Sequence, residues 1–146
     1  MTTLNILRSA ITKIREANNG MVPFALKFRW LTDVANALAY MHRNNSVHKD
    51  IKAKNILLDG NLTAKLADFE LATRGDSSQE TQQFVKKYGE EHNPMMAGTL
   101  THMAPETIKD TGLLLRPNPQ YDVYSFGTVL NFVKYFKRNI DNFINT

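Results

Sequence analysis

Residues 47–58 carry polar side chains whose types and spacing suit phosphate chemistry. Asp50, Lys52 and Asn55 supply a carboxylate, an ammonium group and a carboxamide at short intervals, beside an apolar run. A carboxylate can accept a proton, an ammonium group can neutralise phosphate charge, and amide and carboxylate oxygens are ligands that Mg²⁺ prefers. Asp68 adds a second carboxylate further along the chain. We therefore predict a site for a phosphate group and a divalent cation.

Each of these residues also has an ordinary explanation when it is taken alone. An Asp and a Lys close together on a loop are usually a solvated ion pair, and an isolated Asn is usually a turn residue. The order of several short motifs separates the two interpretations. These motifs are His48-x-Asp50-x-Lys52-x-x-Asn55, Ala67-Asp68-Phe69, Gly98-Thr99, Met103-Ala104-Pro105-Glu106 and Asp122-Val123-Tyr124-Ser125-Phe126-Gly127.

In this order the motifs resemble those of the catalytic lobe of eukaryotic-type protein kinases. The resemblance runs from Leu4 to about Phe136. It implies a fold that is mainly α-helical with a small β-hairpin, a partial C-terminal kinase lobe, and a single partial kinase domain over residues 1–146. The Met-Ala-Pro-Glu and Ser-Phe-Gly motifs favour the tyrosine-kinase-like group, and Lys52 favours Ser or Thr as the phosphate acceptor.

The resemblance also implies a role for each site residue. Asp50 is the expected catalytic aspartate, which would accept the proton of a substrate hydroxyl, and Lys52 would place positive charge beside the transferred phosphate. Asn55 and Asp68 are the expected Mg²⁺ ligands, and Leu57 would form an apolar floor under the adenine ring. ATP and Mg²⁺ are therefore the expected cofactors, with Lys52, Asn55, Leu57 and Asp68 as their contacts.

Other positions gain roles from the same resemblance. His48 and Phe69 are expected to stack in the core, held by Asp122, and Thr99 belongs to the expected docking surface for a substrate peptide. The expected partner is therefore a protein substrate or another protein. The remaining histidines show no metal-ligand spacing, and we assign them ordinary structural roles: these are His42, His92 and His102.

The sequence departs from the kinase pattern in ways that bear on activity. Glu70 stands where the family has glycine, and a requirement for positive φ there would cost about 1–2 kcal/mol of strain. Lys49 replaces an arginine and loses its two-pronged hydrogen bonding. The small-lobe motifs, a Gly-rich loop, a strand lysine and a helix glutamate, have no counterpart. We therefore expect little or no transfer by residues 1–146 alone. The alternatives are a non-catalytic, pseudokinase-like protein-binding module and a truncated gene product.

Composition narrows the class of protein. The chain has 146 residues, of which 42% are hydrophobic, the size and content of one globular domain. The net charge of +4 is scattered along the chain, which argues against nucleic-acid binding, and the absence of cysteine excludes disulfides and zinc–thiolate sites. No signal peptide or apolar run of the roughly 20 residues needed for a membrane span is evident. We expect an intracellular, cytoplasmic protein.

Apolar periodicity predicts the helices. One should start at Leu4, capped by Thr2 or Thr3, and end at Asn18-Asn19-Gly20; a second should follow Pro23 and stop near Asn44. Residues 123–136 form a third pattern, with apolar residues around most of the helix circumference. Because little chain follows to cover that helix, we expect an exposed apolar patch and association through it.

Two short apolar runs predict a β-hairpin. They are Asn55–Leu58 and Ala64–Ala67, joined by Asp59-Gly60-Asn61, in which Asp-Gly favours a tight turn. From Phe69 to about Gly98 the sequence is polar and aperiodic, which predicts a long loop.

Overall fold

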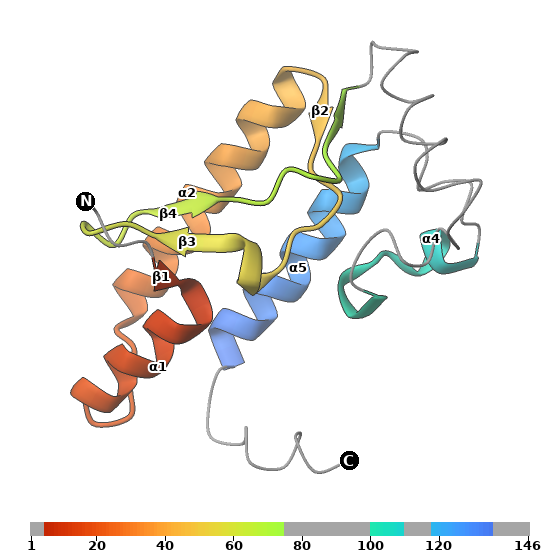
Figure 1. Ribbon diagram of the computed structural model, residues 1–146. Helices are drawn as coiled ribbons and strands as arrows, with labels where there is room; N and C mark the ends of the chain where they lie inside the picture. Colours follow the sequence, from red (N-terminus) through yellow and green to blue (C-terminus); the bar gives the residue numbers. More distant parts are fainter. Residues whose placement is uncertain (1–4, 75–99, 110–117, 136–146) are drawn as a thin grey trace.

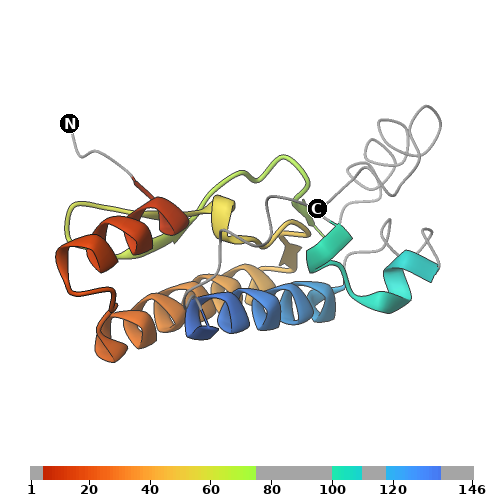
Figure 2. The same cartoon turned by 90° about the horizontal axis from the view of Figure 1, so that it is seen from below.

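The structure is a computed structural model that describes residues 5–74, 100–109 and 118–135 (Figure 1). Most of their elements form two layers (Figure 2). Helices α2 (Phe24–Arg43) and α5 (Pro119–Tyr135) lie side by side in one layer, as Figure 2 shows. The other layer holds helix α1 (Leu7–Ala17) and the short strands, several of which contact α2. The mainly helical fold with a small hairpin is thus confirmed.

Helix α1 begins later than predicted, at Leu7. Residues Asn5–Ile6 form strand β1 instead, and β1 pairs antiparallel with β3 (Ile56–Leu58). Ile6 is the N-cap of α1 and makes no side-chain capping bond, so the predicted threonine cap is wrong. The reason is that pairing with β3 gives the backbone of β1 hydrogen-bond partners that compete with one more turn of helix.

The turn between α1 and α2 agrees with the prediction. Asn19 and Gly20 have left-handed φ values of 48° and 78°, and the Gly20 N–H donates to the Arg15 carbonyl at 2.8 Å. This is a common way to end a helix, because glycine and asparagine tolerate positive φ. Pro23, with φ of −53°, directly precedes α2 and favours its start.

The predicted hairpin is confirmed as β3 and β4 (Ala64–Leu66), which with β1 form a three-stranded sheet in the order β1-β3-β4. Its turn is closed by the Asp59 carboxylate, whose Oδ1 accepts the N–H groups of Thr63 and Asn61 at 3.0 and 2.9 Å. The bond from the Thr63 N–H is the main reason that the pKa of the Asp59 carboxyl lies below its ordinary value. Among the turn residues, positive φ falls on Leu62.

A second, two-stranded sheet was not predicted. It pairs β2 (Ser46–Val47) antiparallel with β5 (Thr73–Arg74), and each strand has two residues, too few to show an alternating pattern. Strand β5 lies within the stretch from Phe69 to about Gly98 that was predicted as a loop. Residues 75–99, which include Thr99 and most of that loop, lie outside the described residues.

The hydrophobic core joins both layers. Trp30 of α2 is the largest fully buried side chain in it, and its indole N–H donates to the Leu62 carbonyl at 3.0 Å. Each fully buried large apolar side chain contributes roughly 1.5–3 kcal/mol. The other fully buried large apolar side chains of this cluster are Leu7, Ile11, Val34, Ile51, Ile56, Leu58, Val129 and Val133.

Helix α5 is buried on one side by the described residues. Tyr121, Val129 and Val133 face the interior, whereas Val123 and Leu130 are 61% and 42% exposed. The predicted apolar surface on this helix is therefore present, while association through it stays a prediction. Neither α5, α2 nor any other described helix has the length and apolar composition that crossing a membrane requires.

Candidate active site

The segment between β2 and β3 carries the predicted catalytic residues and is anchored by one buried carboxylate. Asp122 of α5 is fully buried, and its Oδ2 and Oδ1 accept the backbone N–H groups of His48 and Lys49 at 2.9 and 2.8 Å. The His42 Nε2 lies 2.8 Å from the same Oδ2. Asp122 thus fixes the start of this segment, which we call the catalytic loop after the role predicted for Asp50, to the helical layer, as the resemblance implied.

His48 connects this loop to the segment that carries Asp68. Its Nε2 lies 3.1 Å from the Ala67 carbonyl oxygen, and its Nδ1 lies 3.4 Å from the Asp50 N–H. A carbonyl only accepts and a backbone N–H only donates, so the geometry assigns the proton to Nε2. The neutral imidazole therefore links two segments of the chain, one at Asp50 and one at Ala67.

The predicted pairing of His48 with Phe69 is present, but the predicted burial of Phe69 is wrong. The two rings have centroids 5.1 Å apart at an angle of 51°. His48 is fully buried, whereas Phe69 is 53% exposed. Within the described chain, about half of the Phe69 surface is therefore left uncovered.

The side chains of Lys52 and Asn55 both contact Asp50. The Lys52 ammonium lies 2.6 Å from Asp50 Oδ2, and the Asn55 Nδ2 donates to the same oxygen and to the Asp50 carbonyl, each at 2.9 Å. Asp50 and Asn55 are buried, and Lys52 is partly exposed. Asn55 closes the short helix η1 (Ala53–Asn55) that follows this loop, so local backbone geometry positions its side chain.

Asp68 lies two residues after the end of β4, and its side chain is exposed. The Ala67 N–H donates to the Asn55 carbonyl at 2.9 Å, which ties the segment before Asp68 to the catalytic loop. Asp68 itself has a φ of 62°, a conformation that Asp adopts more readily than most residues. Leu57 lies on β3 opposite Ile6 and is partly exposed.

The donor set fits a hard divalent cation with phosphate oxygens. Both side-chain hydrogen bonds that Asn55 makes within the described chain use Nδ2, so its amide oxygen stays available as a ligand. Asp68 offers an exposed carboxylate. Among the described residues, no group of three or more His, Asp or Glu side chains could hold a metal. Two protein oxygens completed by phosphate and water are typical of Mg²⁺.

Glu70 does not carry the strain that a positive φ would impose. Positive φ occurs in five non-glycine residues of the described chain, among them Asp68 but not Glu70. The conditional strain of about 1–2 kcal/mol is therefore absent at this position. What remains of the glycine replacement is an exposed negative side chain two positions after Asp68.

Lys49 is an unusual residue within this loop. It is 8% exposed and has a φ of 66°. Burial lowers the pKa of its ammonium group from 10.5 to about 8, although the nearby negative charge of Asp122 acts in the opposite direction. With a pKa of about 8, the Lys49 ammonium group loses its proton close to physiological pH.

The segment after residue 99 is attached to α5. Helix η3 (Leu100–His102) is held by the Ser125 hydroxyl, which donates to the His102 carbonyl at 2.7 Å. Helix α4 (Pro105–Lys109) follows, and the Thr107 hydroxyl at its start donates to the Ala104 carbonyl at 2.6 Å. Met103 and Ala104 are buried, and Glu106 is exposed.

Two histidines lie closer to the site than the sequence indicated. His42 contacts Asp122, which no spacing rule could reveal because the two residues are far apart in sequence. Burial lowers the pKa of His102, the charge of Asp50 raises it and that of Lys52 lowers it, so both charges act on this imidazole. His92 lies outside the described residues.

Comparison with known proteins agrees with this geometry. The family model of the protein kinase domain matches residues 6–140. Wall-associated receptor kinase 2 of Arabidopsis thaliana is 42% identical over 107 residues, which are 71% of this chain and 13% of that protein. Receptor-like protein kinase HSL1 of Arabidopsis thaliana is 31% identical over 131 residues, 88% of this chain and 12% of the relative.

A human relative points the same way. Receptor-interacting serine/threonine-protein kinase 1 of Homo sapiens is 33% identical over 117 residues, 74% of this chain and 16% of that protein. The chain thus spans less than a fifth of the length of each of these relatives. The family model matches most of the chain and so shows that this chain belongs to the protein kinase domain family.

Proposed function

We propose that this domain takes part in phosphoryl transfer from ATP to a Ser or Thr hydroxyl of a protein. The observation that carries the proposal is the placement of Asp50 Oδ2 between the Lys52 ammonium and the Asn55 amide, at 2.6 and 2.9 Å. Lys52 and the similarity to a human serine/threonine-protein kinase favour Ser or Thr as the acceptor. We also propose membership of the tyrosine-kinase-like group, on the Met-Ala-Pro-Glu motif from Met103.

In the proposed reaction, Asp50 accepts the proton of the acceptor hydroxyl as the oxygen forms a bond to the terminal phosphorus. The bond from that phosphorus to the bridging oxygen breaks, ADP leaves, and the proton stays on the Asp50 carboxyl. Lys52 neutralises charge on the transferred group. Asn55 holds Asp50 in position through Nδ2.

The Asn55 amide oxygen and the Asp68 carboxylate are the proposed Mg²⁺ ligands. When bound, the cation neutralises phosphate charge and helps to orient the terminal phosphate. Leu57 is the proposed apolar contact for adenine. All three assignments rest on the match of this sequence to the kinase motifs. The two metal ligands are also supported by the backbone hydrogen bond from Ala67 to Asn55, which holds the segments of Asn55 and Asp68 together.

Radiolabelled phosphate transfer tests the proposal. Residues 1–146 alone should transfer little or no label, because the sequence shows no counterpart of the small-lobe motifs. The chain is therefore assayed both alone and joined to the small lobe of a receptor kinase relative, with Mg²⁺, γ-labelled ATP and a mixture of Ser- and Thr-containing peptides as acceptors. We expect Asp50→Asn to reduce labelling at least about 100-fold, because general-base catalysis commonly contributes that much. The control Glu16→Gln removes an exposed carboxylate from α1 and should leave labelling unchanged. Clear labelling that is equal in the wild-type and Asp50→Asn fusions would contradict the proposal.

A non-catalytic protein-binding module is the second candidate. The exposed apolar residues of α5, including Val123 and Leu130, favour it. Thermal melting with Mg²⁺-ATP separates the two candidates, because a ligand at about 100 times its dissociation constant adds roughly 2.7 kcal/mol of stability. A stability gain that Asp68→Asn abolishes supports the kinase site. Absence of both the gain and the label transfer supports the binding module.

A further inference from the structure

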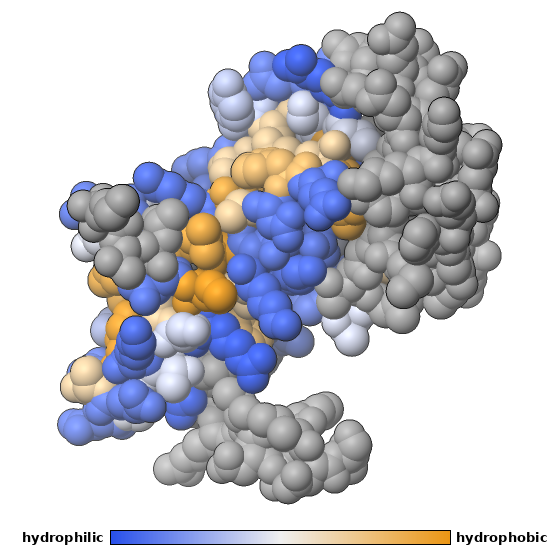
Figure 3. All heavy atoms as spheres, viewed as in Figure 1, coloured by the Kyte–Doolittle hydropathy of each residue, from blue (hydrophilic) through white to orange (hydrophobic). Residues whose placement is uncertain are grey.

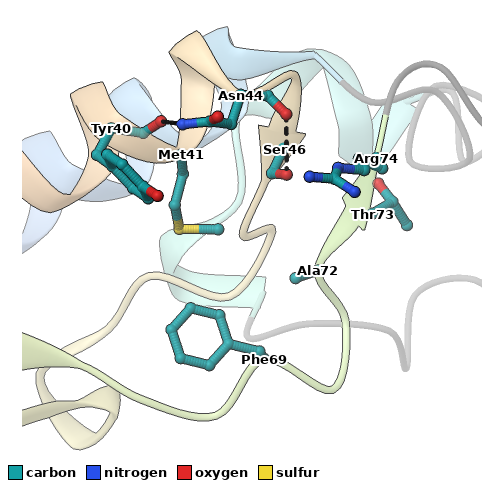
Figure 4. A pocket seen from close by; sticks show the side chains of 8 residues that line it. All are labelled: Tyr40, Met41, Asn44, Ser46, Phe69, Ala72, Thr73 and Arg74. Atoms are coloured by element: carbon teal, nitrogen blue, oxygen red, sulfur yellow. Dashed lines mark hydrogen bonds between the residues drawn. The ribbon is translucent and has the colours of Figure 1, made fainter.

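A hollow of about 350 Å³ lies between the end of α2, β2 and β5 (Figure 4). It is separate from the Asp50, Lys52 and Asn55 group. Figure 3 shows apolar surface in this region, bordered by hydrophilic residues. Its volume lies near the lower end of the roughly 300–1,000 Å³ typical of small-molecule sites, so a compact ligand would fill it.

The floor of the hollow is apolar. Tyr40 and Met41 line it from α2, and Phe69 and Ala72 line it from the segment that precedes β5. Tyr40 is 67% exposed and Phe69 is 53% exposed, so both rings offer uncovered apolar surface within the described chain. Burying such surface under a ligand is favourable at about 25 cal/mol per Å². An aromatic or branched aliphatic group suits this floor.

The rim of the hollow is positively charged. Arg74 lies opposite Ser46 in the β2–β5 pairing, and its guanidinium extends toward Ser46 across the hollow (Figure 4). Within the part of the chain that the structure describes, the Arg74 guanidinium has no hydrogen bond or salt bridge. Arg29, by contrast, donates to the Thr63 hydroxyl. A planar guanidinium matches a carboxylate with two parallel hydrogen bonds.

We propose that this hollow binds a small organic carboxylate that carries an aromatic or branched aliphatic body. The carboxylate pairs with Arg74, and the apolar body packs on Tyr40 and Phe69. The proposal does not depend on phosphoryl transfer. Because the Phe69 ring also contacts the His48 ring at 5.1 Å between centroids, the bound ligand lies one side chain away from the catalytic loop.

The probe for the test is 3-phenylpropionate, titrated into the full chain by isothermal calorimetry and protein-observed NMR. We expect a dissociation constant on the order of 1 mM, which is typical for a ligand with few heavy atoms. The neutral isostere 3-phenylpropanamide and the truncated acid propionate should each bind at least about tenfold more weakly, since each lacks one of the two contacts. The NMR signals of His48 and Tyr40 should shift during the titration.

Variants identify the residues that bind the probe. Arg74→Met should weaken 3-phenylpropionate binding at least about tenfold and leave the weak binding of the amide unchanged. Tyr40→Ala should weaken both ligands. Lys13→Met, which removes an exposed cation from α1, is the matched control and should change neither. Unfolding curves of each variant check that the fold is retained.

Three results would each overturn the proposal. One is the absence of binding by wild type at about ten times the expected dissociation constant. Another is equal affinity for the carboxylate and the amide. The last is equal loss of binding in Arg74→Met and Lys13→Met, which would show attraction by net charge alone.

Discussion

Lys49 makes the stability of this domain depend on pH in a way that few surface groups could. Its ammonium group is buried, and burial lowers its pKa from 10.5 to about 8. The folded state therefore binds fewer protons at this site than the unfolded state between those two pH values. Stability rises with pH wherever the unfolded state binds more protons. The buried charge of Lys49 therefore lowers the free energy of unfolding at pH 7, and this loss becomes smaller as the pH increases.

The magnitude follows from the two pKa values. A shift from 10.5 to about 8 corresponds to roughly 3 kcal/mol of lost stability while the lysine is charged. Between pH 7 and 9.5, the same two values predict that the free energy of unfolding increases by about 2 kcal/mol through this group. Below pH 7 the contribution is flat, because Lys49 is charged in both states.

The matched variant is Lys49→Met, which keeps an unbranched side chain at the same left-handed φ of 66° and so cancels the backbone strain. We expect it to be more stable than wild type at pH 7, and we expect this advantage to shrink by about 2 kcal/mol by pH 9.5. Urea unfolding at a series of pH values measures both quantities. Lys13→Met, with an exposed lysine, should show no such change. Parallel pH curves for wild type and Lys49→Met would refute the reasoning.

Further predictions concern other residues around the catalytic loop. Asp122→Ala should lower the free energy of unfolding by at least about 3 kcal/mol in urea titrations, because buried N–H groups lose their acceptor, and Asp122→Asn should cost less; equal costs would contradict this. Glu70→Gly should not increase the melting temperature, since Glu70 has no positive φ to relieve; a clear increase would show hidden strain. By NMR titration, the pKa of His102 should fall in Asp50→Asn and rise in Lys52→Met, and no change in either variant would show that those charges do not reach the ring.

Elements with strong local patterns were predictable from the sequence. Helix α2 shows apolar residues at helical spacing between Pro23 and Asn44, and the hairpin has an Asp59-Gly60 turn, so both appear where expected. Strands β2 and β5 were not predictable, because two residues cannot show a period. The start of α1 was misplaced for a related reason: the pairing of Asn5 with Leu58 is a long-range contact that overrides local helical periodicity.

The candidate site was predictable to the extent that it depends on local spacing. Asp50, Lys52 and Asn55 lie on one short loop, so their convergence follows from the sequence. The contact between His42 and Asp122 depends on how α2 packs against α5, and the local pattern of neither helix contains it. The exposure of Phe69 likewise depends on which other residues pack against its ring, which the motif alone does not specify.

The most direct test of the kinase site is where a divalent cation binds. Mn²⁺ resembles Mg²⁺ in its preference for oxygen ligands, and its unpaired electrons broaden the NMR signals of nearby residues. With ATP and substoichiometric Mn²⁺, we predict the strongest broadening at Asn55 and Asp68, little at the Asp59 turn, and loss of the effect in Asp68→Asn. Broadening that is equal at Asp59 and Asp68, or that Asp68→Asn leaves unchanged, would contradict the assignment of this loop as the metal and phosphate site.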